Sequence, residues 1–130
     1  MKKILLSCAG GFSTSLLVNK MKEEANKSNK NYQIKAVSAD LISNLVEKDM
    51  PDCILLGPQI RYMVDGLKPI TEKNNIPLAV IPIQDYGRMN GLAVLKQAER
   101  LMQIWYIQKI YKLKLYWNEF WKEYDLQNSF

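Results

Sequence analysis

The first 27 residues constrain the fold most, because their pattern changes twice within a short distance. Residues 3–7 form an apolar run that is long enough for one buried strand. Two glycines follow within residues 8–11, and glycine lets the backbone turn tightly and leaves room for a ligand. Residues 13–27 then carry apolar side chains at helical spacing. We therefore predict a strand, a glycine loop and a helix, with Cys8 at the carboxyl end of the strand.

This predicted geometry favours anion binding. Backbone N–H groups of a tight loop and of a helix's first turn lack partners and point the same way, and the helix dipole adds positive potential. The same field stabilises a thiolate, so we expect the pKa of Cys8 to lie below the ordinary value of about 8.5. One interpretation is a cysteine that attacks phosphorus; the alternative is a small apolar residue packed at a strand end. The expected phosphate-binding residues are Ala9, Gly10, Gly11, Phe12, Ser13, Thr14 and Ser15.

One substitution bears on the reaction. Phosphatases that use a cysteine in such a loop place an arginine six residues after it, where this chain has Thr14. That arginine would clamp the oxygens of the transferring phosphoryl group. A loop without it is expected to hold phosphate but to hydrolyse poorly, as suits a phosphate carrier. A low-molecular-weight phosphatase-like enzyme and a non-catalytic phosphate- or partner-binding module stay open as alternatives.

The composition narrows the chemistry further. The chain has 130 residues, no histidine and two cysteines. It therefore has no Cys/His catalytic pair and no histidine phosphoacceptor, and we expect neither a metal nor a cofactor. Two cysteines are too few for a disulfide scaffold, which favours a reducing cytoplasm. No signal peptide or transmembrane run is apparent, and the scattered basic residues do not predict nucleic-acid binding.

Strand and helix patterns alternate along the rest of the chain. This alternation predicts an α/β fold with a four-stranded parallel sheet of order 2-1-3-4 and helices on both faces. Further strands are expected at 32–37, 53–56 and 78–83. One helix is expected at 40–47, and another begins at Pro58 and is kinked or ended by Pro69. A loop at 84–91 precedes a last helix, which is lined by Leu92, Leu95 and Leu101.

Ligands of such sheets bind beyond the carboxyl ends of the strands. The loops after Ser7, Leu56 and Ile83 are expected to share that rim. On it, Gln59 and Tyr62 are possible supporting residues that donate hydrogen bonds to a phosphoryl group or orient the cysteine loop, although Tyr62 fits ordinary surface packing equally well. Asp85 fits either a proton-handling carboxylate or a turn residue. The turn residue is the preferred interpretation, since a carboxylate would repel a phosphoryl dianion.

The run 8–18 resembles the phosphocysteine loop of the IIB components of the bacterial sugar phosphotransferase system, of the lactose, cellobiose and chitobiose type. Segments 55–63 and 85–91 agree with the same family, and the resemblance covers residues 1–103. It implies that Cys8 accepts phosphate from a phosphohistidine of a IIA protein and passes it to a sugar on the membrane permease IIC. It also implies a disaccharide such as cellobiose, chitobiose or lactose, and a cytoplasmic protein that reaches the inner face of the membrane through IIC.

The last 27 residues form a second expected segment, 104–130, after the IIB-like domain at 1–103. They hold nine of the thirteen aromatic residues in the chain. Their pattern predicts an aromatic amphipathic C-terminal helix whose apolar face begins at Tyr106. This face is expected either to pack on the domain or another subunit, or to lie on a membrane surface.

Overall fold

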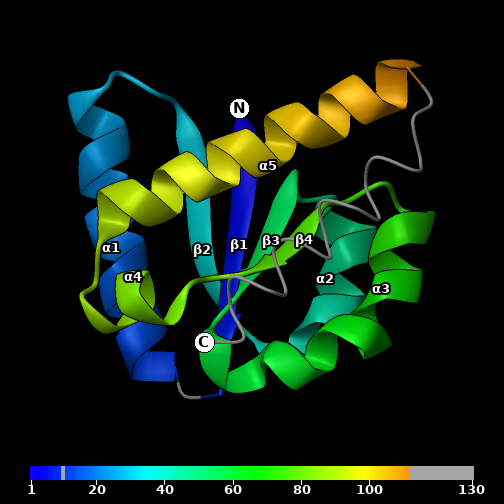
Figure 1. Cartoon of the computed structure of the whole chain (residues 1–130), viewed down its shortest axis with the longest axis horizontal. Coiled ribbons are helices and arrows are strands. Elements are labelled where there is room, and N and C mark those ends of the chain that lie inside the picture. Colours follow the sequence, from blue (N-terminus) through cyan, green and yellow to red (C-terminus); the bar gives the residue numbers. More distant parts are fainter. Residues whose placement is uncertain (10, 112–130) are drawn as a thin grey trace.

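The computed structural model describes residues 1–9 and 11–111, and the sheet at its centre has four parallel strands (Figure 1). Neighbouring strands follow the order β2-β1-β3-β4, as the sequence predicts. The longest register pairs all seven residues of β1 with β2, from Lys2 with Tyr32 to Cys8 with Ser38. The strands are β1 (Lys2–Cys8), β2 (Tyr32–Ser38), β3 (Cys53–Leu56) and β4 (Leu78–Val80).

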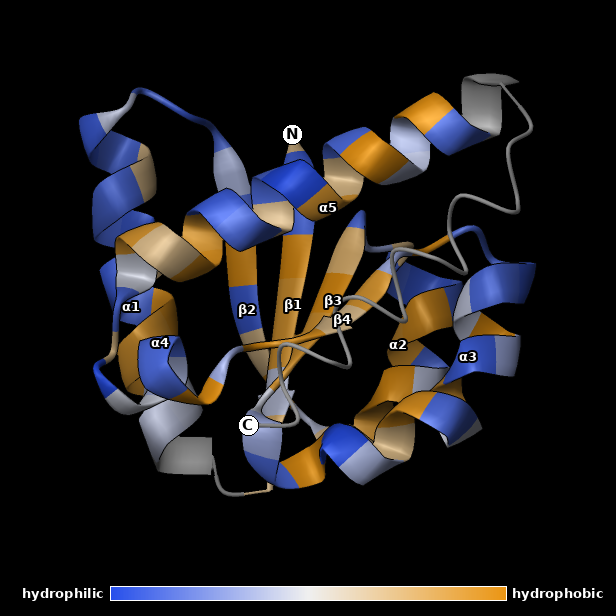
Figure 2. Cartoon of the chain, viewed as in Figure 1, coloured by the Kyte–Doolittle hydropathy of each residue, from blue (hydrophilic) through white to orange (hydrophobic). Residues whose placement is uncertain are grey.

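Helices cover the sheet on both faces. β1 and β3 are buried at successive residues, which point to opposite faces, and Figure 2 shows the strands as an apolar centre inside more polar helices. α1 packs against α5, and α2 packs against α3. The helices are α1 (Gly11–Lys27), α2 (Ile42–Asp49), α3 (Val64–Lys73), α4 (Ile83–Gly87) and α5 (Gly91–Tyr111), with 3₁₀ segments η1 (Ala39–Leu41) and η2 (Pro58–Met63).

α1 and α5 approach each other closely at Gly91. A Cβ atom on Gly91 would lie 2.6 Å from the backbone carbonyl carbon of Lys20, too close for any side chain. Glycine at the start of α5 therefore allows direct backbone contact with α1, and this contact fixes the end of the segment that precedes α5.

The fourth strand is shorter than the predicted range 78–83, and the predicted loop after it contains a helix. The Ile81 N–H still donates to the Leu56 carbonyl (2.8 Å), but Pro82 has no N–H to continue the ladder. The Pro82 carbonyl instead accepts the Tyr86 N–H (3.0 Å), so that α4 begins where a longer strand was expected.

The helix does not end at Pro69, which was one of the two predicted outcomes, because Pro69 lies inside α3. The chain departs from helical geometry earlier, at Ile60 of η2 (φ −116°). Pro69 and Asp65, whose carbonyl loses its helical partner, are both exposed, so water can satisfy that carbonyl.

α5 continues past residue 103 to Tyr111, and its far end turns a different side to the core than predicted. Ile104 and Trp105 pack against the core, whereas Tyr106 is 62% exposed. The rest of the expected aromatic extension, residues 112–130, lies outside the described residues, and its helix and its separate-domain status stay predictions. Within the part of the chain that the structure describes, no helix is long and apolar enough to cross a membrane.

Candidate active site

Cys8 ends the central strand β1, and α1 begins three residues later at Gly11. Its side chain is almost buried, with 7% exposed. The Thr14 hydroxyl, on the first turns of α1, forms a hydrogen bond with the Cys8 sulfur. Thr14 occupies the position at which a cysteine phosphatase carries its arginine, and here that position supplies a neutral hydroxyl to the sulfur.

The loop after β3 packs directly on Cys8. The Gly57 N–H donates to the Ser7 carbonyl (2.7 Å), which brings the end of β3 beside the end of β1. A Cβ atom on Gly57 would lie 2.9 Å from the Cys8 Cβ and 2.7 Å from Oε1 of Gln59. The exposed Gln59 side chain thus folds back over Gly57, the residue that packs on Cys8.

The segment after β4 supplies a residue that the sequence analysis did not single out, Tyr86 of α4. Its side chain is buried, and its hydroxyl lies 2.6 Å from the Ser13 Oγ and 3.4 Å from the Thr14 Oγ1. Tyr86 lies in the loop segment that carries the family resemblance and is one of four aromatic residues before residue 104. The sequence signal that could have identified Tyr86 is an aromatic residue with a hydroxyl group in a loop at the rim.

The structure therefore brings together Cys8, Ser13 and Thr14 with Gly57, Gln59 and Tyr86, from three loops at one end of the sheet. The other predicted residues lie around this group or outside it. Tyr62 is 76% exposed, and Asp85 is half-buried. Ala9 and Ser15 are exposed, Gly11 and Phe12 form the first turn of α1, and Gly10 lies outside the described residues.

The field at Cys8 favours a negative charge. α1 has 17 residues and carries no acidic side chain in its first turn, so the positive end of its dipole near Cys8 is not neutralised locally. Cys53 has the opposite surroundings in β3. It is completely buried, and this burial, together with the nearby Asp52 carboxylate, raises the pKa of its thiol far above the ordinary range. Cys53 is thus a packing residue.

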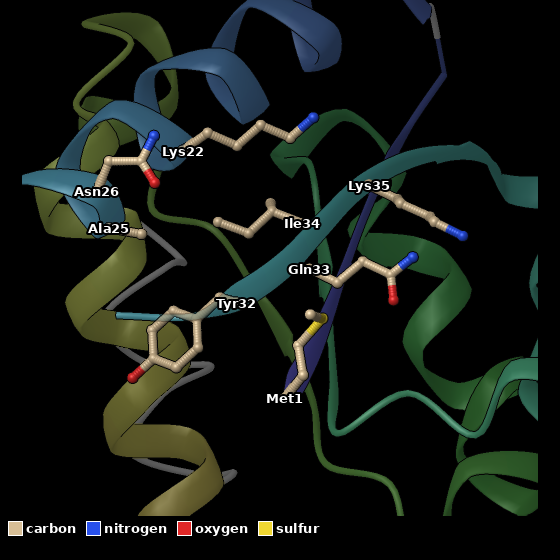
Figure 3. A pocket seen from close by; sticks show the side chains of 8 residues that line it. All are labelled: Met1, Lys22, Ala25, Asn26, Tyr32, Gln33, Ile34 and Lys35. Atoms are coloured by element: carbon tan, nitrogen blue, oxygen red, sulfur yellow. The ribbon is translucent and has the colours of Figure 1, made fainter. Parts of the chain in front are cut away.

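A cavity of about 640 Å³ lies away from this site. Figure 3 shows the side chains that line it. Its lining includes Met1 and Tyr32, at the amino ends of β1 and β2, and the side chains of Lys22 and Lys35. Because Cys8 is at the carboxyl end of β1, the length of the sheet separates the cavity from the thiol.

Fold and site together define a parallel α/β domain that holds a buried cysteine between its central strand and its first helix. Residues 3–97 match the family described as "PTS system, Lactose/Cellobiose specific IIB subunit". The chain belongs to this family of phosphotransferase-system IIB subunits. It is a phosphoryl carrier of a sugar phosphotransferase system and, like its homologues, a phosphotransferase subunit.

Individual relatives agree with this assignment. The chain is 44% identical over 104 residues to the galactose-specific EIIB component of Lactococcus lactis subsp. cremoris, covering 78% of this chain and 96% of that relative. It is 40% identical over 102 residues to the oligo-beta-mannoside-specific EIIB component of Bacillus subtilis, covering 78% and 97%.

Solved structures support the fold. The cellobiose-specific IIB protein of Borrelia burgdorferi superposes with a TM-score of 0.65 at 38% identity, covering 78% of this chain and 92% of that chain. The lactose-specific IIB domain of Streptococcus pneumoniae gives a TM-score of 0.68 at 20% identity, covering 77% and 96%, and this likeness concerns the fold alone.

Proposed function

We propose that Cys8 is the residue that carries the phosphoryl group. In this proposal it accepts the group from a phosphohistidine of a IIA protein and passes it to a sugar bound to the membrane permease IIC. The observation that carries the proposal is the position of Cys8: at the end of the central strand, before the amino end of a long helix, with the Thr14 hydroxyl on its sulfur. Each of these features stabilises a thiolate or the phosphoryl group attached to it.

The first transfer balances without a metal or a redox partner. The Cys8 thiolate attacks phosphorus, the S–P bond forms, and the P–N bond breaks with its electron pair returning to the histidine ring of IIA. A proton from water or a nearby acid reaches the other ring nitrogen, so that the ring leaves as neutral imidazole. In the second transfer a sugar hydroxyl attacks phosphorus and the S–P bond breaks. Its electron pair returns to Cys8 as thiolate, and the proton of the sugar hydroxyl goes to a base or to water. The backbone amides of residues 9–15 hold the phosphoryl oxygens in both steps.

Exposed apolar side chains beside the site support docking of partner proteins. Leu16 and Ile83 are 44% and 55% exposed, and each lies one helical turn from a member of the Ser13–Tyr86 contact. They offer an apolar border to the rim, as expected for a carrier that must meet two partners in turn. Through IIC the protein would work at the inner face of the membrane, with a cytoplasmic location.

Relatives differ in the sugar that their names give, namely galactose, cellobiose or an oligo-beta-mannoside. We assign a disaccharide such as cellobiose, chitobiose or lactose as the final acceptor. Uptake of each labelled sugar by cells that lack this chain tests that choice directly.

Incubation with phosphorylated IIA tests the role of Cys8. The wild-type chain is expected to gain one phosphoryl group by intact mass, and Cys8→Ser to gain none, because a serine hydroxyl is not ionised near neutral pH. Cys53→Ser is the matched control, since it changes the other buried cysteine, and it is expected to accept phosphate normally. Labelling of Cys8→Ser would refute the assignment. Release of free phosphate without an adduct would indicate a phosphatase, and no reaction would indicate a binding module.

A further inference from the structure

We propose that the Tyr86 hydroxyl is a positioning group: it directs the Thr14 hydroxyl at the Cys8 sulfur and so favours departure of that sulfur in the second transfer. The hydroxyl chain from Ser13 through Tyr86 and Thr14 to Cys8 is the observation behind it. The effect on phosphoryl transfer rests on the proposed role of Cys8. The hydrogen bonds between the hydroxyl groups do not depend on that role.

The chain of hydroxyl groups joins two segments of the protein that are 72 residues apart in the sequence. Tyr86 comes from α4, while Ser13 and Thr14 lie on successive positions of α1. The Tyr86 and Thr14 side chains are buried, so these hydroxyls have few other partners to choose from. Tyr86 thereby links the segment after β4 to the sulfur through the Thr14 hydroxyl.

The state of the sulfur sets the direction of the hydrogen bonds. A thiolate has no hydrogen, so the contact with Thr14 requires the threonine hydroxyl to donate to it. The Thr14 oxygen is then free to accept from Tyr86, and the Tyr86 oxygen is free to accept from Ser13. Each hydroxyl donates once and each bond points toward the sulfur, so ionisation of Cys8 aligns the whole chain.

The hydrogen bonds of the hydroxyl chain are strongest when the sulfur carries a full negative charge. In the S–P adduct the sulfur is neutral and accepts hydrogen bonds weakly, whereas hydrogen bonds to an ionised group are roughly twice as strong as neutral ones. The hydroxyl chain therefore favours the thiolate over the adduct. It assists the step in which thiolate is the leaving group, and it does not assist the step in which thiolate is the nucleophile.

This asymmetry separates a positioning role from a structural one. Loss of a typical hydrogen bond changes an equilibrium by about twofold to tenfold. We therefore expect Tyr86→Phe to slow transfer from the phosphorylated chain to sugar by that factor. Acceptance from IIA, measured well above the pH at which Cys8 ionises, is expected not to slow. General damage to the site would slow both steps.

Alkylation of Cys8 against pH provides a readout that needs no partner protein. Tyr86→Phe is expected to raise the midpoint by roughly 0.4 to 1.1 pH units. The charged side chains on the other segments that border the site include Asp40 of η1, Arg61 of η2, Asp85 of α4 and Arg88, which follows α4, and the variant keeps all four. Cys53 is buried and serves as an internal unreactive thiol.

The matched control is Tyr32→Phe, which also removes a tyrosine hydroxyl with a hydrogen bond, here 2.7 Å to the Glu99 carboxylate. Tyr32 begins β2 at the end of the sheet away from Cys8, so this variant is expected to leave the alkylation midpoint and both transfer rates unchanged. Urea unfolding of both variants verifies that each is folded at the assay conditions.

A double-mutant cycle with Thr14→Val tests whether Tyr86 acts through Thr14. The midpoint of the double variant is expected to equal that of Thr14→Val alone, because the proposed effect of Tyr86 on the sulfur runs through the Thr14 hydroxyl. Additive shifts, or a Tyr86→Phe midpoint equal to wild type, would overturn the inference. If Cys8→Ser still accepts phosphate, the proposed function fails, yet the alkylation result on Cys8 still decides the hydroxyl chain.

Discussion

Gly57→Ala is a demanding test of the site, because this glycine is the point at which the loop after β3 contacts Cys8. An alanine Cβ would lie 2.9 Å from the Cys8 Cβ, whereas unstrained carbon atoms approach to about 3.5–4.0 Å. The Gln59 side chain, 2.7 Å from the new atom, is exposed and can move aside at little cost. Cys8 lies at the end of a buried central strand, so its Cβ atom cannot move aside in the same way. The two strand ends must therefore separate by about 0.5–1 Å.

Two effects follow, and they can be measured separately. Overpacking of this kind is expected to lower the free energy of unfolding by about 1–3 kcal/mol, measured by urea denaturation. A displacement of about 1 Å at a reacting atom costs up to about 100-fold in rate, so acceptance of phosphate from IIA, followed by rapid quench, is expected to fall much further than stability.

Gly66→Ala is the matched control. Gly66 lies in α3, where an added Cβ meets nothing within 4 Å, and alanine in a helix is favoured over glycine by about 0.5–1 kcal/mol. This variant is expected to be slightly more stable and fully active. Normal acceptance and stability in Gly57→Ala would refute the view that Gly57 fixes the position of the Cys8 side chain.

Further predictions concern the frame around the site. Gly91→Ala is expected to lower the free energy of unfolding by about 1–3 kcal/mol, seen in urea, because its Cβ would clash with the Lys20 backbone. Burial and the Glu99 carboxylate raise the pKa of Tyr32 to about 12. Stability is therefore expected to fall as pH rises from about 10 to about 12, since the unfolded chain loses that proton first, and Tyr32→Phe should lack this fall. A chain that ends at Gln103 is expected to accept phosphate from IIA. It is expected to unfold at a lower urea concentration than the full chain.

The sheet could be predicted because its strands are short apolar runs separated by helical patterns. The strand order follows from right-handed crossovers, and Cys8 and the glycine loop are adjacent in the sequence. The ends of strands and helices were predicted less well where a single proline interrupts the pattern of its neighbours. Pro82 ends β4 early through its missing N–H, and Pro69 is tolerated in α3 because it faces solvent.

The contacts of the site were harder to predict than its location. That Tyr86 reaches Ser13 depends on the short helix α4, which periodicity over five residues cannot reveal. Tyr62 and Tyr86 have the same chemistry and both follow strand ends, yet only Tyr86 is buried against α1. At the far end of α5 the predicted apolar face begins at Tyr106, whereas the core contacts Ile104 and Trp105, a difference set by tertiary packing.

Location of the phosphoryl group on the phosphorylated wild-type chain tests the central claim most directly. The chain is labelled by phosphorylated IIA, digested under conditions that preserve the S–P bond, and sequenced by tandem mass spectrometry. We predict a single phosphoryl group on the sulfur of Cys8, and its loss when IIC membranes and sugar are added. A phosphoryl group on the hydroxyl of Ser13, Thr14 or Ser15, or on Cys53, would contradict the account.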